Sequence, residues 1–211
     1  MRDFYEITTV SFFDEKFAYN ETTDPANYSK PQCPRCPKCG RYLGKLYWLE
    51  PRRVILSKPK YGDFVLGNNF LVSEKFKEAY EKTDLKGIKK FLPVEVAKVR
   101  YMREKSPLPP QYYILELEYS FARIDKEKSI IKWDMAGAEP NQACSLCFPY
   151  GAIPKKIKGI YIDDSEWGGE DIFHLHETGG VVYASQKFVD FCLEKEFTNF
   201  KYVNTKDYVY S

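Results

Sequence analysis

The sequence predicts an α+β protein in which one small unit is used twice, and two observations lead to this prediction. Two Cys-x-x-Cys pairs begin at Cys36 and Cys144, which are 108 residues apart. Further along, the segment at 67–76 resembles the segment at 179–188 in its apolar residues and in its Ser-x-Lys-Phe ending. Similarity that recurs at such intervals indicates an internal repeat.

Each unit is expected to contain a Cys-x-x-Cys turn, a strand, a helix and a strand, with small antiparallel or mixed sheets. The repeats cover about 33–103 and 141–211, and a β-hairpin at about 111–134 lies between them. We expect the whole chain, 1–211, to form one compact domain in which the two repeats share a zinc site with four cysteine ligands. A chain of this length can bury a sizeable core.

The predicted metal ligands are Cys36, Cys39, Cys144 and Cys147. A Cys-x-x-Cys turn places two sulfurs on one side of a bend, and two such turns supply the four thiolates of a tetrahedral structural Zn²⁺ site. Such a site has no open position for water, so it stabilises the fold and does not catalyse a reaction. Cys33 forms a competing pair with Cys36, but the repeat interval favours Cys39. The alternative is that these cysteines are buried or pairwise oxidised thiols.

The interval between the two copies changes once along the chain. Asp63 and Asp171 are 108 residues apart, whereas Gly87 and Asn199 are 112 residues apart. Four extra residues in the second copy, around His174–Glu177, account for the change. Because glycine and asparagine both tolerate a positive φ, we expect the same left-handed turn after the helix of each copy.

The remaining elements follow from local patterns. Ser73 and Ser185 each precede apolar residues at three- and four-residue spacing, which predicts an N-cap followed by a short helix. Apolar and polar residues alternate over 113–121, as in a strand with one buried face, and this strand would pair with 130–133 in the central hairpin. The other predicted elements are a hairpin at 42–48 and strands at 3–7, 70–72, 91–99, 181–183 and 200–203.

Composition and charge limit the function classes. The chain is 44% hydrophobic and 29% charged with a net charge of only +2, which indicates a soluble globular protein and does not indicate a nucleic-acid or membrane surface. It begins without the pattern of a secretory signal and has no run of about 18 apolar residues that could span a membrane. We therefore expect a cytoplasmic protein, in which clustered cysteines bind metal or take part in chemistry more often than they crosslink.

An enzyme is not expected, because the sequence shows no Ser/His/Asp order, phosphate-binding glycine loop or His-Glu-x-x-His helix. His174 and His176 could share a strand face and, with Asp171 and Glu177, bind a second metal. We expect them instead to be polar residues of the extra loop. Cys192 lies on the apolar face of the second helix and is expected in the core.

The acidic stretch at 163–171 contains the residues predicted to bind a partner. Such stretches are usually solvated loops. Carboxylates around a tryptophan can also contact a basic protein, with the indole as the anchor. The residues predicted for this role are Asp163, Asp164, Glu166, Trp167 and Glu170.

The sequence resembles the double-CxxCG motif immunity protein family. Three features carry this resemblance: the Cys36–Gly40 motif, the segment at 70–76 that runs on to Gly87, and the second cysteine pair. This family is encoded beside toxins in bacterial polymorphic toxin systems and is best known from myxobacteria. The resemblance implies a cytoplasmic protein that binds and blocks a cognate toxin. The family's cysteines correspond to Cys36, Cys39, Cys144 and Cys147. One departure is Phe148, which stands where the family motif has glycine.

The alternative is a zinc-ribbon-like nucleic-acid-binding or regulatory protein. Such a protein needs a basic patch with aromatic side chains that stack on bases. The near-neutral net charge argues against it, as it does not indicate a basic surface. The basic residues available for such a patch are Lys45, Arg52, Arg53, Lys58 and Lys60.

Overall fold

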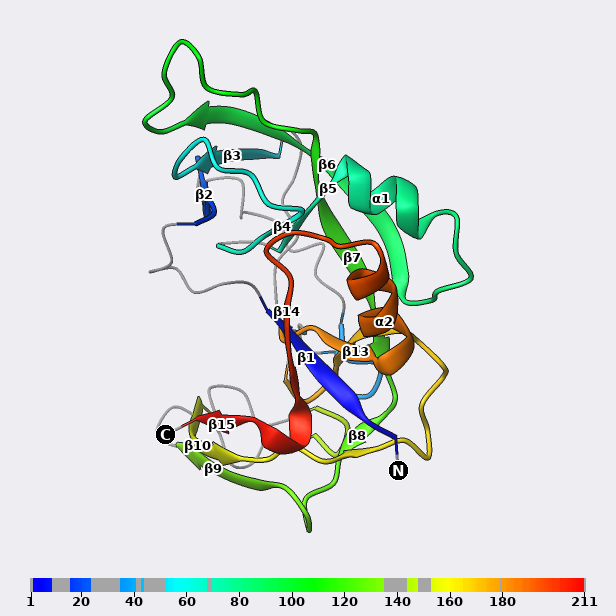
Figure 1. The fold of residues 1–211 in the computed structure, drawn as a ribbon. Helices are drawn as coiled ribbons and strands as arrows, with labels where there is room; N and C mark the ends of the chain where they lie inside the picture. The colour runs from blue at the N-terminus through cyan, green and yellow to red at the C-terminus, as the bar shows by residue number, and fades with distance from the viewer. Residues whose placement is uncertain are drawn as a thin grey trace.

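A computed structural model describes residues 2–8, 16–23, 35–40, 43, 52–67, 70–134, 144–147, 153–178 and 180–210, and Figure 1 shows their fold. Within these residues, ten strands form one mixed sheet. Its order is β14 (Lys201–Asn204), β1 (Phe4–Thr8), β13 (Tyr183–Ser185), β12 (Ile172–Leu175), β7 (Tyr112–Ser120), β6 (Ile88–Val99), β3 (Arg53–Leu56) and β2 (Asn20–Thr22). Two further strands, β4 (Phe64–Val65) and β5 (Leu71–Ser73), join it because β5 pairs with β7.

Two smaller sheets accompany this large sheet in the described part of the chain. One contains β15 (Val209–Tyr210), β10 (Ile153–Lys158) and β9 (Ile130–Asp134), and the other contains β11 (Ile162–Asp163) and β8 (Arg123–Ile124). Their apolar side chains pack against Phe4, Phe173 and Tyr183 of the large sheet. A short 3₁₀ helix, η3 (Thr205–Asp207), precedes the last strand.

The large sheet corrects the expectation of small sheets. It arises because β12 pairs in parallel with β7, which joins the strands of the two predicted units. The predicted central hairpin is also wrong, since β7 pairs with β6, β5 and β12, while β9 pairs with β10. Alternating apolar residues indicate that a strand has a buried face but do not specify its hydrogen-bonding partner. The predicted hairpin at 42–48 lies outside the described residues except for Leu43.

The two helices begin where the sequence predicts them. In α1 (Glu74–Tyr80) and α2 (Gln186–Glu194), the caps are Ser73 and Ser185, whose hydroxyls accept hydrogen bonds from Phe76 N and Phe188 N. Both helices lie on the same side of the sheet (Figure 1). Helices this short are marginal alone, so tertiary packing must stabilise them. Neither of these described helices has the length and apolar composition needed to cross a membrane.

Aromatic side chains supply that packing. The ring of Phe76 on α1 lies 6.1 Å from that of Phe188 on α2, between ring centroids, and both side chains are fully buried. Phe64 and Phe197 approach the ring of Phe76 at 5.1 and 5.2 Å. Burying one such ring stabilises the fold by about 2 kcal/mol. This aromatic cluster therefore forms the core between the helices and the sheet.

Beside this core, the buried carboxylate of Asp63 connects the start of α1 to the segment after α2. Its Oδ1 accepts a hydrogen bond from Ser73 Oγ at 2.7 Å. Its Oδ2 accepts bonds from the backbone N and the Oγ1 of Thr198 at 2.9 and 2.8 Å. One side chain thereby fixes the cap of one helix relative to the end of the other.

Asp171 makes the corresponding connection in the opposite direction. Its Oδ1 accepts a hydrogen bond from Ser185 Oγ at 2.8 Å, and its Oδ2 accepts one from Lys86 N, after α1, at 3.0 Å. The backbone repeats the same contact in both places. Ser185 N donates to Asp171 O at 2.9 Å, and Ser73 N donates to Asp63 O at the same distance. We call the contacts of Asp63 and Asp171 the two carboxylate bridges.

The turns after the helices agree with the prediction from the sequence. Gly87 has φ +116° and Asn199 has φ +59°. A side chain at Gly87 would place its Cβ 1.8 Å from the backbone oxygen of Ile172, so glycine is required there. Asn199 uses its side chain instead, and its Nδ2 donates to the backbone oxygen of Phe64 at 2.6 Å. The turn at Gly87 thus contacts β12, and the turn at Asn199 contacts β4.

We expect Asp63→Ala and Asp171→Ala each to lower the free energy of unfolding by about 3 kcal/mol, because each leaves buried donors without a charged acceptor. Chemical denaturation measures this change. Asp190→Ala, at an exposed position of α2, is the matched control and should stay within about 0.5 kcal/mol of the wild type. Equal stability of all three variants would contradict the importance of the bridges.

Candidate metal centre

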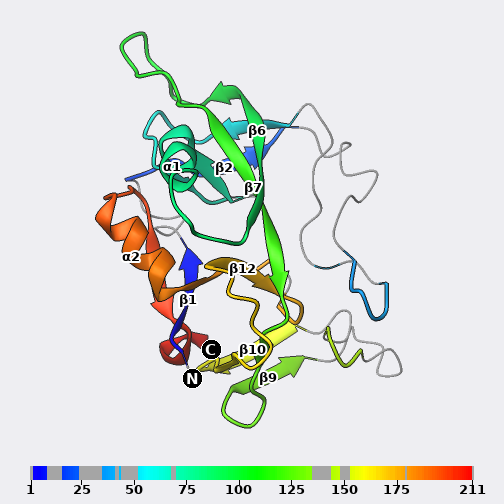
Figure 2. The ribbon, with the colours of Figure 1, turned by 90° about the vertical axis from the view of Figure 1, so that its right-hand side faces the viewer.

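The structure brings the two predicted cysteine pairs together. Cys36 Sγ lies 3.9 Å from Cys144 Sγ, and Cys39 Sγ lies 3.5 Å from Cys147 Sγ. All four sulfurs lie within 4.8 Å of one another. Figure 2 shows the two turns together on the side of the molecule away from α1 and α2. Four thiols gathered in this way could hold a metal ion.

Local hydrogen bonds shape the two turns. Gly40 has φ +72° and donates its N–H to Cys36 O at 2.8 Å, which closes the first turn. In the second turn, Leu146 N donates to Cys144 Sγ at 3.4 Å. Lys38 Nζ, in the first turn, donates to Ser145 Oγ in the second. Cys33 and Phe148 lie outside the described residues.

The spacing of the sulfurs fits a tetrahedral ion. Metal–sulfur bonds of about 2.3 Å in a tetrahedron place neighbouring sulfurs about 3.8 Å apart. The observed separations of 3.5 and 3.9 Å bracket that value. An ion could therefore bind all four sulfurs without a large movement of the backbone. With four protein ligands, the site would be closed to water and would serve a structural role.

Ionisation of one thiol opposes ionisation of the next. Burial raises the pKa of Cys144, but backbone N–H groups of Cys147 and Leu146 and the neighbouring thiols lower it to about 6 overall. Burial and the three neighbouring thiols raise the pKa of Cys147. Without a cation, the four sulfurs could not all become thiolates, because each negative charge would raise the pKa of the next thiol. A bound cation removes this repulsion.

Apolar and aromatic residues support the thiols on one side. Cys36, Leu43 and Cys147 are buried together, and Tyr119 of β7 packs against them. The Tyr119 hydroxyl donates to Leu43 O at 2.8 Å. This contact connects Leu43 to the large sheet.

A buried ion pair supports the second turn. Arg123 donates through Nη2 to Ser145 O at 2.6 Å and to Glu177 Oε1 at 2.9 Å. The Glu177 side chain is only 1% exposed, and its Oε2 accepts a bond from Ile124 N at 2.9 Å. This role could not be assigned from the sequence, because Arg123 and Glu177 are 54 residues apart and belong to no recognisable motif.

His174 does not lie in an extra polar loop, which corrects that expectation for this residue, whereas His176 follows β12 in a bend. His174 is part of β12, and both side chains are buried. His174 Nδ1 lies 2.6 Å from Val181 O, and His176 Nδ1 lies 2.8 Å from Ser120 O. Both rings pack on Tyr119. Burial lowers the pKa of His176, so its ring is neutral near pH 7. Cys192 is buried in the core, as predicted.

Three residues of the acidic stretch, Trp167, Gly169 and Asp171, line a groove. Asp163 and Glu166 are exposed, whereas the Trp167 ring packs edge-on against Phe4 at 5.5 Å. Trp167 Nε1 donates to Glu170 O at 3.1 Å. Its indole is thus held in place, and it forms part of the wall of the groove.

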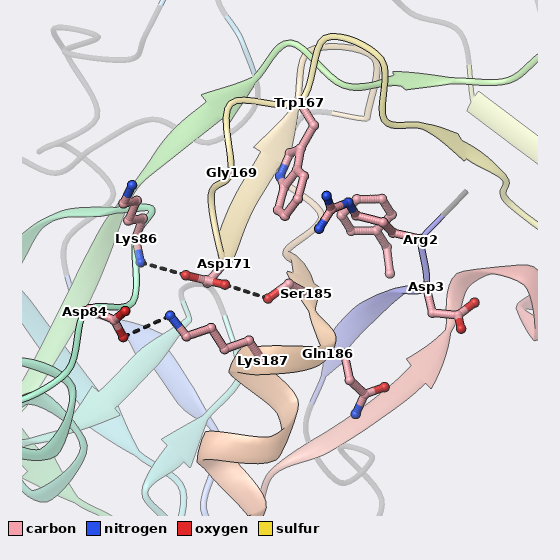
Figure 3. Close-up of a pocket in the computed structure, with 11 residues that line it drawn as sticks. Arg2, Asp3, Asp84, Lys86, Trp167, Gly169, Asp171, Ser185, Gln186 and Lys187 are labelled. Carbon is pink, nitrogen blue, oxygen red and sulfur yellow. Dashed lines mark hydrogen bonds and ion pairs between the residues drawn. The ribbon is translucent and has the colours of Figure 1, made fainter.

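The groove itself has a volume of about 560 Å³ (Figure 3). Arg2 places its guanidinium 4.8 Å from the centre of the Trp167 ring and 3.5 Å from Asp164. Lys187 pairs with Asp84 at 2.9 Å on one side of the groove, and Asp171 also lines it. Glu170, beside the groove, accepts a hydrogen bond from Ser120 Oγ at 3.0 Å.

The sequence of the chain matches a known protein family. A model of the Imm11 immunity protein family matches residues 44–207. The chain belongs to the Imm11 immunity protein family. The match includes both helices, both carboxylate bridges and Cys144 and Cys147, while Cys36 and Cys39 precede it. A comparison with curated proteins finds no match.

We expect the purified protein to contain about one metal ion per chain, as measured by elemental analysis. Cys36→Ser and Cys147→Ser should remove it and lower the melting temperature, since metal binding contributes directly to folding. Cys33→Ser is the control and should keep both the metal and the stability. Metal-free wild-type protein whose stability a chelator does not change would contradict the site.

Proposed function

We propose that the chain is an immunity protein that binds and neutralises a cognate bacterial toxin in the cytoplasm of the cell that makes both. Membership of the Imm11 family is the observation that carries this proposal. The resemblance of the cysteine motifs to the double-CxxCG immunity proteins supports it. Such an inhibitor acts by complementary surfaces held on a rigid scaffold, which limits the entropy lost on binding.

The metal that we propose for the four cysteines is Zn²⁺. Tetrahedral sites with four sulfur ligands select zinc or iron, and zinc performs no redox chemistry that would disturb a structural site. A reducing cytoplasm keeps cysteines available as thiolates. We therefore propose zinc in a structural role, with Cys36, Cys39, Cys144 and Cys147 as its ligands.

We also propose that the scaffold contains one unit twice within a single domain. Matching strand registers support this. Phe64 pairs with Val72 in the first unit, and Ile172 pairs with Ala184 in the second. In addition, β7 lies between β5 and β6, as β1 lies between β13 and β14, with antiparallel pairing throughout. The carboxylate bridges run in both directions between the units.

The proposed contact surface is the acidic stretch beside the groove. Exposed Asp163 and Glu166 can attract a basic partner and accelerate its association. Trp167, Asp164 and Glu170 have partners within the protein, so their role would be to shape the surface. We propose binding and not catalysis, because the cysteine site would be closed by its four ligands and both histidines are packed against Tyr119.

The nucleic-acid alternative is less well supported. Arg53 pairs with Glu95 at 2.8 Å, which neutralises part of the predicted basic patch. Lys45 lies outside the described residues. A net charge of +2 provides little general attraction to a phosphate backbone.

Co-expression tests the proposed function. The toxin encoded next to this gene should stop growth when expressed alone, and the chain should restore growth when it is expressed with the toxin. An unrelated soluble protein expressed at the same level is the control. Failure of the folded chain to restore growth, together with no detectable complex, would refute the proposal.

A further inference from the structure

The β6–β7 hairpin ends in a loop, residues 100–111, that projects from the sheet (Figures 1 and 2). It carries three exposed apolar side chains. Tyr101 is 83% exposed, Leu108 is 79% exposed and Met102 is 41% exposed. Single exposed apolar residues are common, but several on one projecting loop indicate an interaction site.

Hydrogen bonds hold this loop in one shape. Arg103 N donates to Ser106 Oγ and Ser106 N donates to Arg103 O, both at 2.9 Å. Pro107 O accepts a bond from the Tyr61 hydroxyl at 3.0 Å, which fastens the loop to the body of the protein. Prolines at 107, 109 and 110 further restrict the backbone. A loop ordered in advance loses little entropy when it binds.

The backbone conformation of Tyr101 is a second observation that indicates a binding site. Its φ of +55° is unusual for a residue with a bulky side chain, and such conformations cost about 1–3 kcal/mol. The strained backbone presents the tyrosine ring to solvent instead of burying it. Strain of this kind is concentrated at binding sites, where the surrounding structure maintains it.

Charge on the loop favours an acidic partner. Arg103 and Lys105 are exposed and have no carboxylate within ion-pair distance among the described residues. Arg100, at the base, is already paired with Glu21 at 2.6 Å. Glu104 is the one acidic residue in the loop, so the loop keeps a positive charge.

We propose that this loop is a second toxin-binding element, which inserts Tyr101 and Leu108 into an apolar cleft with an acidic rim on the toxin. The inference rests on the proposed function and specifies the partner's surface. A projecting loop can bury both side chains only in a concave partner.

The loop and the acidic stretch lie at opposite ends of the molecule. In both ribbon views the loop is at the top, whereas the N-terminus, whose Arg2 contacts Asp164, is at the bottom (Figures 1 and 2). Substitutions in the two surfaces can therefore be compared without direct contact between them. A toxin with two separate contact regions would engage both.

Binding of purified wild-type chain and variants to the purified toxin, measured by surface plasmon resonance, tests the proposal. Tyr101→Asn combined with Leu108→Ala removes both apolar anchors, and asparagine tolerates the positive φ at 101. We expect the dissociation constant to rise at least 100-fold, mostly through faster dissociation, with an unchanged melting temperature. The matched control is Ile130→Ala with Val209→Ala, at exposed apolar positions elsewhere, and should bind as the wild type does.

The outcomes separate this inference from the proposed function. Wild-type affinity in the loop variant, with affinity lost in Asp163→Lys combined with Glu166→Lys, would overturn the role of the loop and leave the proposed function intact. A loop variant that binds the toxin normally but no longer self-associates in sedimentation would also overturn it, in favour of a contact between copies. Absence of toxin binding by the wild type would remove both proposals.

Discussion

The arrangement of the protein depends on two buried carboxylates. Asp63 and Asp171 each accept the hydroxyl of a helix cap and a backbone N–H from the segment after the other helix. Neither helix is long enough to be stable alone, so each needs this connection and the aromatic core beside it. Because the two bridges run in opposite directions, the positions of the helices and of the strands before them are fixed together.

The cysteine cluster lies on the side away from the helices and secures a different region (Figure 2). Its turns are attached to the large sheet through Tyr119 and to the smaller sheets through Arg123 and Glu177. Two sets of interactions therefore stabilise the scaffold. The first is the hydrogen bonds of the two carboxylate bridges in the core, and the second would be the bonds from the four cysteines to a metal near the surface. Loss of the metal should affect the outer turns more than the helix core.

Part of this scaffold could be predicted from the sequence, because similar residues recur at similar intervals along the chain. The cysteine pairs, the caps Ser73 and Ser185 and the turns at Gly87 and Asn199 were found in this way. The single large sheet could not be predicted, since the parallel pairing of β12 with β7 depends on tertiary structure and not on the pattern within either strand. The burial of His174 and the Arg123–Glu177 pair were missed for the same reason, because charged and polar residues give no periodic signal when they are buried.

Under the proposed function, the protein is a scaffold that would offer two surfaces to a toxin, the acidic stretch at one end and the apolar, basic loop at the other. We propose that neutralisation occurs when one copy of the chain binds one toxin molecule. Titration of a fixed amount of active toxin with the purified chain tests this claim most directly. We predict that toxin activity falls linearly and reaches its minimum at about one chain per toxin, as expected for tight complex formation. Complete inactivation by a small fraction of an equivalent would show turnover by an enzyme and would contradict the claim.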